Sequence, residues 1–443
     1  MAEAPTIFAL STAPGRAGIA VIRVSGPAAG DLVDALAPPR AKKRFAALRR
    51  IRDPQTGETI DDGLVIWFGA PRTETGEDMA EFHVHGGPAI VKAMLAVLGR
   101  QPGCRLAEPG EFARRAFANG KLDLAQVEGL ADLINAETEA QRRQALGQMR
   151  GALSELYEGW RADLIRASAL VEAAIDFSDE GDVASNAIEV ARGIVADLQT
   201  AISAHLDDGN RGEILREGFR VVLAGPPNAG KSSLLNALAR RDAAIVSEEA
   251  GTTRDVIEVR LDLEGLPVIV TDTAGIREAH GAVEQEGIRR TLAHARQADL
   301  VLWLSDASAP PVAAPAEVAA RGDKFFLPLA TKIDIAGAAP HGDMLGVSAK
   351  TGAGLAELTR RLADIASSRT GDLTSPAITR ERYRHQLIRC MHSLQEFMHL
   401  PAGEYELRAE DLRVAAHALG RITGRVDVED VLGEIFARFC IGK

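Results

Sequence analysis

The segment 225–232 (GPPNAGKS) constrains this chain most, because it matches the phosphate-loop pattern G-x-x-x-x-G-K-[ST]. An apolar run at 219–224 predicts a buried strand before it, and 233–238 predicts the helix that follows. Backbone N–H groups of such a loop, together with the helix N-terminus, bind phosphate oxygens. The segment therefore predicts a nucleotide site in which Lys231 reaches the β- and γ-phosphates and the Ser232 hydroxyl binds Mg²⁺.

Two motifs downstream of the loop predict the parts that sense the γ-phosphate. The sequence DTAG at 272–275 follows a predicted strand at 266–271. Its aspartate, Asp272, can hold the Mg²⁺ shell, and the Gly275 N–H can contact the γ-phosphate. Thr253, in the sequence GTTRD, is placed to bind Mg²⁺ from a switch loop.

Two further motifs predict a guanine pocket. After predicted strands at 300–304 and 325–330, the sequence TKID ends in Asp334, whose carboxylate can accept hydrogen bonds from guanine N1 and N2. The Lys332 stem can cover the base, and the sequence SAK at 348–350 can complete the pocket. Five motifs in this order indicate a Ras-like G domain that hydrolyses GTP. The residues assigned to the nucleotide are Asn228, Ala229, Gly230, Lys231, Ser232, Ser233, Ser247, Thr252, Thr253, Asp272, Thr273, Ala274, Gly275, Lys332, Asp334, Ser348, Ala349 and Lys350.

The G-domain motifs depart from the common pattern at two positions. Ile276 stands where many small GTPases have the glutamine that orients water, and Arg254 and Arg277 are either substitutes for it or solvated charges. Thr331 stands where the guanine motif normally has asparagine. We expect guanine selectivity to survive with one amide fewer, but to be weaker.

Length, charge and composition limit the number of domains, the partners and the location that we expect for this chain. Its 443 residues suggest about three domains. A formal net charge of −11 argues against a protein that binds nucleic acid over its whole surface. The three cysteines show neither metal-ligand nor disulfide spacing. Without a signal peptide or an apolar run of membrane-spanning length, we expect a soluble, cytosolic protein with no membrane partner.

The apolar periodicity divides the chain into an α+β domain (1–118), two helical blocks (119–214 and 367–443) and the G domain (215–366) between those blocks. The prediction is therefore a multidomain α/β protein. We expect a G domain inserted into one all-α domain; two separate helical domains are the alternative, with thinner cores. Polar residues inside the predicted N-terminal strands either belong to a pocket or alternate onto a wet face. Spacing favours the wet face for these residues, which are Arg23, Glu81, His83 and His85.

The whole chain resembles the MnmE (TrmE) family of tRNA-modification GTPases. The motifs that carry this resemblance are PGR at 14–16, IRVSG at 22–26, TGED at 75–78, HGGP at 85–88, PGEF at 109–112, KLDL at 121–124 and the C-terminal FCIGK at 439–443. The resemblance implies an enzyme that modifies the wobble uridine of certain tRNAs at C5, with the flavoprotein partner MnmG (GidA) in a hetero-oligomer. It also implies a homodimer and an N-terminal domain that binds 5-formyltetrahydrofolate or a related one-carbon folate.

The resemblance also implies which residues do this work. Folate would be bound by Arg23, Glu81, Lys121 and Lys443. A K⁺ ion would supply the charge that an arginine finger supplies elsewhere, and its expected ligands are Asn228, Ser247, Glu249 and Thr252. Oxygen donors suit such a hard cation. Glu284 would orient the attacking water, with Asn228 and Lys231 as the other catalytic residues.

Two rival functions stay open at this stage. A ribosome-assembly GTPase would act as a switch without modification chemistry, but it should carry a basic RNA-binding module, and neither flanking region is basic enough to indicate one. A scaffold for the flavin partner would retain folate binding only as a vestige. Cys440 could act as a nucleophile or acid, but a buried structural thiol is favoured because no base is near it in sequence.

Overall fold

The computed structural model describes 4–177, 181–208, 210–241, 243–245, 258–272, 298–316, 325–335, 338–371, 375–426, 432–433, 435–436, 439 and 442. The chain divides into two compact units, one that combines 1–131 with 420–443 and one that spans 132–419. In the first unit the C-terminal tail meets the end of the first strand, where the Ser11 hydroxyl donates to the Gly442 carbonyl at 3.0 Å. The finer boundaries predicted at 118, 214 and 366 stay a prediction.

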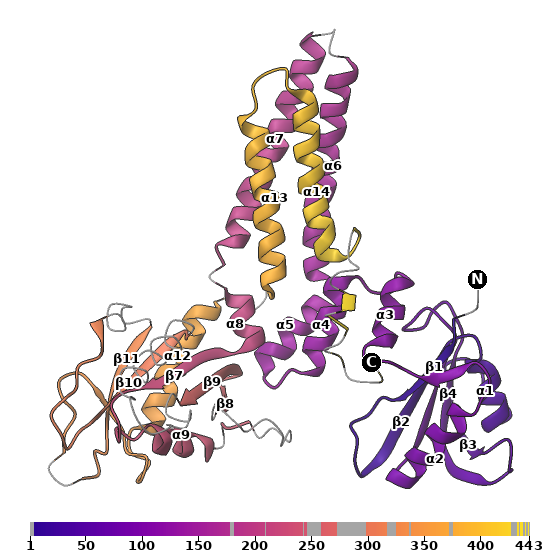
Figure 1. The fold of residues 1–443 in the computed structure, drawn as a ribbon, viewed down its shortest axis with the longest axis horizontal. Coiled ribbons are helices and arrows are strands. Elements are labelled where there is room, and N and C mark those ends of the chain that lie inside the picture. The colour runs from indigo at the N-terminus through magenta and orange to yellow at the C-terminus, as the bar shows by residue number, and fades with distance from the viewer. Residues whose placement is uncertain are drawn as a thin grey trace, which may run out of the picture. The chain divides into compact units, whose positions relative to one another are not determined.

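A six-stranded sheet in the order β3-β4-β5-β2-β1-β6 forms the body of the first unit (Figure 1). All neighbouring strands are antiparallel except β1 and β6. The strands are β1 (Thr6–Leu10), β2 (Ala17–Ser25), β3 (Ala46–Arg52), β4 (Thr59–Phe68), β5 (Met79–Gly86) and β6 (Cys104–Leu106). The predicted N-terminal strands that contain Arg23 and Glu81 are thus confirmed, as β2 and β5.

The two faces of this sheet differ. The inner face carries alternating apolar residues such as Ile22, Val65 and Phe82, which form one core with helices α1 (Ala29–Leu36) and α2 (Pro88–Gly99). On the outer face, α3 (Glu111–Ala118) covers the β1 side, where its Phe112 packs against Ile7 and Ala9, and the same ring lies 5.9 Å from the Arg23 guanidinium of β2. Among the described residues, the outer surfaces of β5, β4 and β3 are left without a covering helix.

The second sheet has the order β12-β11-β10-β7-β9-β8, and all its pairs are parallel except β8 with β9. Buried apolar side chains from its strands form one core with α9 (Lys231–Ala239) and α12 (Leu355–Thr370). The strands are β7 (Phe219–Ala224), β8 (Glu258–Leu263), β9 (Leu266–Asp272), β10 (Leu300–Asp306), β11 (Phe326–Thr331) and β12 (Leu345–Gly346). The four strands predicted from the motifs are β7, β9, β10 and β11, and their parallel pairing brings the loops at their carboxyl ends together.

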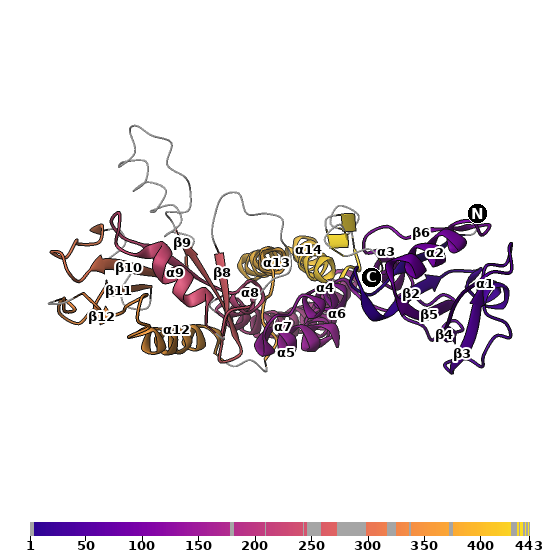
Figure 2. The ribbon, with the colours of Figure 1, turned by 90° about the horizontal axis from the view of Figure 1, so that it is seen from below.

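Helices from both sides of the G domain pack into one bundle (Figures 1 and 2). Its long helices are α6 (Ala152–Asp176), α7 (Gly181–Leu206), α13 (Glu381–His399) and α14 (Tyr405–Thr423), preceded by α4 (Leu124–Ile134) and α5 (Glu139–Met149). Gln148 donates to the buried Tyr383 hydroxyl at 3.3 Å, and Arg384 donates to the Leu206 carbonyl at 2.9 Å. Hydrogen bonds between residues so far apart in sequence confirm one helical domain with an inserted G domain.

The first turn of α5 joins this helical domain to the β8–β9 hairpin. The Ala140 N–H donates to the Gly265 carbonyl at 3.0 Å, and Glu137 pairs with Arg260 at 3.0 Å. Ala140 itself is buried in the core of the G domain. The hairpin strand that ends at Asp272 is therefore held at its far end by the helical domain.

Among the described residues, none of the helices combines the length and the apolar composition that crossing a bilayer requires.

Candidate functional site

The phosphate loop has the backbone that its glycines predict. Gly225 has a φ of 146°, and a Cβ on it would lie 2.4 Å from the Leu304 carbonyl oxygen, so only glycine fits. Gly230, with a φ of 90°, begins α9 at the end of the loop. The Lys231 ammonium folds over the loop and donates to the carbonyls of Gly225 and Pro226, both at 2.9 Å. This lysine is thus positioned at the mouth of the loop, as the motif predicts.

Two oxygen ligands expected for Mg²⁺ converge in the structure. The Ser232 hydroxyl at the start of α9 donates to Asp272 Oδ2 at 2.6 Å, and Asp272 is only 1% exposed. Leu223 pairs with Asp272 in the parallel β7–β9 ladder, which places the carboxylate beside the loop. A hydroxyl and a carboxylate in contact fit the coordination of a hard divalent cation.

Asn228 lies in the loop with a left-handed backbone, at a φ of 60°. Asparagine tolerates this region better than most residues, because its short polar side chain bonds locally. Its side chain is exposed rather than packed into the core. The amide is therefore available to a ligand of the loop, although no described contact fixes its role.

The predicted guanine residues Lys332, Asp334, Ala349 and Lys350 line one cavity of about 220 Å³. The lining residues are Gly230, Ser233, Leu234, Thr331, Lys332, Asp334, Ile335, Val347, Ala349 and Lys350. The Ser348 hydroxyl donates to Asp334 Oδ1 at 2.6 Å, and this bond lowers the pKa of Asp334 below its ordinary value. The carboxylate is thus ionised and oriented before any base binds.

Lys332 is held beside this cavity by a second carboxylate. Its φ is 59°, and its ammonium contacts Asp306 Oδ2 at 2.6 Å, from the end of β10. The hydrogen bond from Lys332 lowers the pKa of Asp306 to about 2. Since the charged end of Lys332 is engaged, its aliphatic stem is left to line the cavity.

Thr331 has a role that sequence reasoning missed. Its hydroxyl, in a side chain only 4% exposed, donates to the Ala229 carbonyl of the phosphate loop at 2.7 Å and lies 3.2 Å from the Ser305 carbonyl. The threonine therefore connects the guanine motif to the loop, and the expected weakening of guanine selectivity stays a prediction. Only the substitution itself signalled that the position was unusual.

Removing this hydroxyl should destabilise the protein. We expect Thr331→Val, which keeps the shape of the side chain, to lower the free energy of unfolding by about 1–3 kcal/mol, because the buried Ala229 carbonyl loses its donor. Urea unfolding measures the change. Thr331→Ser, which keeps the hydroxyl, is the matched control and should stay close to the original; equal losses in both variants would contradict the role of the hydrogen bond.

Several predicted residues lie outside the described part of the chain, and their predictions stay untested by the structure. For the nucleotide and its ions these residues are Ser247, Glu249, Thr252, Thr253, Thr273, Ala274, Gly275 and Glu284, together with Arg254, Ile276 and Arg277. For the folate site they are Lys443 and the neighbouring Cys440.

In the first unit, Arg23 and Glu81 meet on the outer face of the sheet. They are directly paired between β2 and β5, and Arg23 donates to Glu81 Oε1 at 3.1 and 3.2 Å. Glu74 contacts the same guanidinium at 2.7 Å, and His83 contacts Glu81 at 3.2 Å. The face predicted as wet is this outer face, but Arg23 and Glu81 are only 18% and 17% exposed and form an ion cluster.

Lys121, the third described residue predicted for folate, is exposed and packs near Gly76. Gly76 belongs to the 69–78 connection between β4 and β5, which also carries Glu74. The structure therefore brings Lys121 to the connection that contacts Arg23. It gives no direct bond between Lys121 and the Arg23–Glu81 pair.

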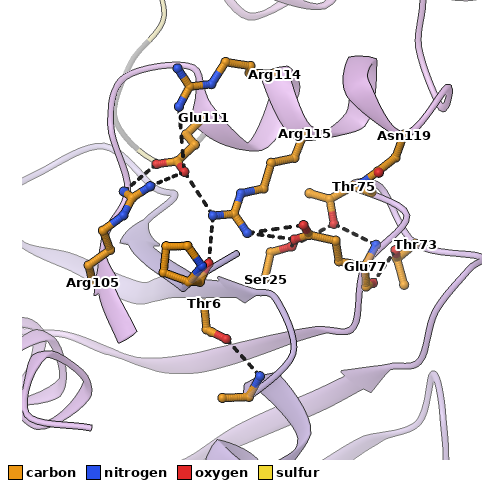
Figure 3. A network of polar contacts seen from close by, with 12 residues as sticks. Thr6, Ser25, Thr73, Thr75, Glu77, Arg105, Glu111, Arg114, Arg115 and Asn119 are labelled. Atoms are coloured by element: carbon orange, nitrogen blue, oxygen red, sulfur yellow. Dashed lines mark hydrogen bonds and ion pairs between the residues drawn. The ribbon is translucent and has the colours of Figure 1, made fainter. Parts of the chain in front are cut away.

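A polar network holds this connection in place (Figure 3). Arg115 of α3 lies between Glu111 and Glu77, at 3.0 Å from each. Glu77 also accepts a hydrogen bond from Ser25 at 2.7 Å, and Asn119 donates to the Thr75 carbonyl at 2.7 Å. The network thus ties α3 to the connection that carries Glu74.

Glu111 anchors the network. Burial alone would raise the pKa of Glu111, but hydrogen bonds from Arg105, from the Glu108 N–H and from Arg115 outweigh burial and hold the pKa at about 2. The stabilisation from this ionised carboxylate is fully present above its ordinary pKa of 4.5 and is lost as the pH falls toward 2.

We therefore expect Glu111→Gln to lower the free energy of unfolding by about 3 kcal/mol at pH 7, since three arginines lose a buried partner. The difference from the original protein should shrink as the pH falls below about 4.5, which urea unfolding across pH would reveal. Glu108→Gln is the control: Glu108 is 62% exposed, and its pair with Arg114 should contribute less than about 1 kcal/mol. A pH-independent loss in Glu111→Gln would contradict the assignment.

Comparison with known proteins finds matches along the whole chain. The model of the GTP-binding protein TrmE N-terminus matches residues 6–121, and that of the MnmE helical domain matches 124–440. The chain is 56% identical to the tRNA modification GTPase MnmE of Parvibaculum lavamentivorans, over 99% of this chain and 100% of that protein. It is 53% identical to the tRNA modification GTPase MnmE of Methylorubrum populi, over 99% of this chain and 98% of that protein.

Among solved structures, the G domain of the T. maritima FeoB iron transporter is 26% identical and matches 33% of this chain and 98% of that chain, with a TM-score of 0.25. The chain belongs to the MnmE family of tRNA-modification GTPases.

Proposed function

We propose that this GTPase is activated by K⁺ and, with the flavoprotein partner MnmG, modifies C5 of the wobble uridine of certain tRNAs with a one-carbon unit from a tetrahydrofolate. We further propose that it works in the cytoplasm as a homodimer. Family membership supports the tRNA-modification role. The observation that carries the folate part is the ion cluster of Arg23, Glu74 and Glu81 on the outer face of the N-terminal sheet.

At the nucleotide site, each described residue has a task that follows from its contacts. Lys231 would exchange the loop carbonyls for phosphate oxygens, which are stronger acceptors for an ammonium group. Ser232 and Asp272 would hold Mg²⁺, directly and through its water shell. Asp334, held by Ser348, would accept hydrogen bonds from the guanine edge. These groups bind and orient GTP, and a bound Mg²⁺ supplies charge neutralisation at the phosphates.

At the folate site, a partly buried carboxylate is suited to a pterin. Glu81 can accept hydrogen bonds from adjacent ring N–H groups, while two hydrogen bonds from Arg23 hold its carboxylate in place. Glu74 is more exposed, at 38%, and lies at the outer end of the Arg23 guanidinium. An anionic folate tail would compete with Glu74 for Arg23, whereas Glu81 would remain paired.

The test is calorimetry with 5-formyltetrahydrofolate on the full chain. We expect Arg23→Ala and Glu81→Ala to weaken folate binding at least tenfold, because a hydrogen bond to a charged group is worth about 1.5–3 kcal/mol. GTP hydrolysis should be nearly unchanged, since both residues lie in the unit that lacks the phosphate loop.

His85→Ala is the control for this experiment, because His85 lies at the end of the same strand, is 70% exposed and pairs with Asp61 instead. Unchanged folate binding in both Arg23→Ala and Glu81→Ala would remove the cluster from the folate site. Equal loss of folate binding and of GTP hydrolysis would indicate misfolding. Mass spectrometry of tRNA nucleosides from cells that lack the protein tests the modification itself.

A further inference from the structure

The segment 40–52 (RAKKRFAALRRIR), here called the basic strip, has a charge opposite to that of the chain. It contains seven arginines and lysines and no acidic residue, whereas the whole chain has a formal net charge of −11. Such a concentration of positive charge on an acidic protein attracts polyanions locally, without causing non-specific binding of polyanions over the whole surface. The basic strip therefore differs from the rest of the surface in the partner it can bind.

The basic strip lies along the free edge of the N-terminal sheet. Its second half is strand β3, which pairs with β4 and ends the strand order of the sheet (Figure 2). Its first half is the connection before β3, in which Lys42, Lys43 and Arg44 are all exposed. The strip thus presents cations from both a loop and a sheet edge.

Most of these cations are not neutralised. Arg40 pairs with Asp31 and Asp34, and Arg50 pairs with Asp62. Arg44 and Arg49 donate to backbone carbonyls. Among the described residues, no carboxylate lies within ion-pair distance of five strip cations, which are Lys42, Lys43, Arg44, Arg49 and Arg52. Their charge remains available to an anionic partner.

An aromatic side chain stands among these cations. Phe45 is 65% exposed and directly follows Arg44, and Leu48 two positions into β3 is 69% exposed. Exposed aromatic rings flanked by cations are typical of proteins that stack an unpaired base while contacting the phosphate backbone. This combination favours RNA over a purely electrostatic partner.

Leu48 and Arg50 of the basic strip lie on the same outer face of the sheet as the Arg23–Glu81 pair, whereas Arg49 alternates onto the inner face with Ile51. Side chains of directly paired residues lie on the same face, and the register connects Leu48 to Leu64 and Leu64 to His83, which contacts Glu81. Three strand spacings separate β3 from β2, which is about 14 Å. An RNA bound at the strip could therefore extend a base toward the proposed folate site.

We propose that the basic strip binds the sugar–phosphate backbone of the RNA that this GTPase modifies, with Phe45 stacking on an unpaired base. The inference relies on the family's tRNA-modification role but not on the proposed folate or K⁺ chemistry. Charge complementarity selects RNA, and the acidic residues named above limit the contact to the five unneutralised cations.

The test measures binding of unmodified tRNA to the full chain by fluorescence anisotropy across salt concentrations. A variant with Lys42→Gln, Lys43→Gln and Arg44→Gln should make the slope of log affinity against log salt shallower by about 2, since each lost phosphate contact contributes about 0.7. At 0.1 M salt this corresponds to a loss of affinity on the order of 100-fold. Phe45→Ala should weaken binding about 5- to 100-fold with little change in slope, and Phe45→Trp should restore it.

The matched control removes the same charge from exposed helical positions, through Arg166→Gln, Arg389→Gln and Arg413→Gln, and should leave both affinity and slope unchanged. Circular dichroism and urea unfolding, measured in parallel, should be the same in all variants and would show that both compact units fold. An unchanged slope in the strip variant, or no tRNA binding by the original protein, would overturn the proposal.

Two other partners of the basic strip, a second copy of the chain and a membrane, would give different experimental results. If the strip is an interface between two copies, the strip variant will change the mass measured by light scattering, and that change would overturn the proposal. If the strip binds membranes, vesicles of anionic phosphatidylserine will bind the original protein and not the strip variant, with tRNA affinity equal in both, which would also overturn it.

Discussion

An Asp334→Asn variant is expected to prefer xanthosine triphosphate over GTP, with affinity for GTP falling by about 100-fold or more. Guanine offers two adjacent donors at N1 and N2, which the ionised carboxylate accepts. Because the Ser348 hydroxyl donates to Oδ1, the amide oxygen of the variant should occupy that position and the amide nitrogen should replace Oδ2. A donor then faces the guanine amino group, while xanthine presents a carbonyl there. A mismatch at a site built for hydrogen bonding is among the strongest forms of discrimination.

Competition between the two nucleotides in a binding or hydrolysis assay measures this change. Asp334→Ala is the control, because it should lose GTP binding without gaining xanthosine triphosphate. Ser348→Ala should keep the preference for GTP but weaken it, since the carboxylate loses the bond that orients it. If Asp334→Asn keeps the original preference, Asp334 does not read the base, and the cavity of about 220 Å³ has another occupant.

The nucleotide site could be predicted from sequence because its parts are local. The phosphate loop needs glycines at fixed positions, and the structure shows why at Gly225, where a Cβ would collide with the Leu304 carbonyl. Asp272 and Asp334 follow buried strands, and parallel pairing of those strands gathers them at one edge. Local pattern and sheet topology together therefore determine the described half of the site.

Other features could not be predicted because they depend on residues far apart in the sequence. The pattern placed Arg23 and Glu81 on a wet face, but the register pairs them directly, and Glu74 reaches Arg23 from a connection. From sequence, Thr331 was interpreted only as the loss of the asparagine amide that is usual at this position. In the structure its hydroxyl donates a hydrogen bond to the phosphate loop, about 100 residues earlier. No periodicity encodes such contacts, because they arise only after the strands pair.

The basic strip shows a different reason for a missed feature. From sequence, the overall charge of each region that flanks the G domain was considered, and the overall charge of the N-terminal domain did not indicate an RNA-binding module. The structure shows that the cations of 40–52 lie on one edge strand and the connection before it, with few acidic neighbours. Local density at an exposed edge, rather than regional net charge, determines the attraction felt by a polyanion.

GTP hydrolysis is expected to be about 100-fold faster in KCl than in NaCl at equal ionic strength, the scale on which one preorganised charge-stabilising group acts. The reason is that Ile276 stands where many small GTPases have a glutamine, and that the family resemblance places K⁺ where an arginine finger supplies charge elsewhere. Asn228 is exposed within the phosphate loop and can contribute an oxygen ligand. NH₄⁺, which is similar in size to K⁺, should also accelerate turnover, whereas the smaller Na⁺ would fit the same oxygen shell poorly.

The substitution at Asn228 should remove the side-chain oxygen without straining the backbone. At a φ of 60°, alanine would add about 1–2 kcal/mol of backbone strain, whereas glycine takes this conformation freely. Asn228→Gly therefore removes only the side-chain oxygen, and it should abolish the difference between the two salts while GTP binding persists through the loop N–H groups and Lys231. Asn228→Asp, which keeps an oxygen at the same place, should retain part of the difference.

The Glu284→Ala variant distinguishes the orientation of the attacking water from the binding of K⁺. If Glu284 orients the attacking water, its loss should lower turnover in both salts and leave their ratio unchanged, because the cation site is intact. A steady-state hydrolysis assay of the original protein, Asn228→Gly and Glu284→Ala in each salt provides every comparison. Equal rates of the original protein in KCl and NaCl would rule out the cation mechanism, because the charge at the phosphates must then come from the protein itself. Arg254 and Arg277, both in the predicted switch segments, would be the first residues to replace.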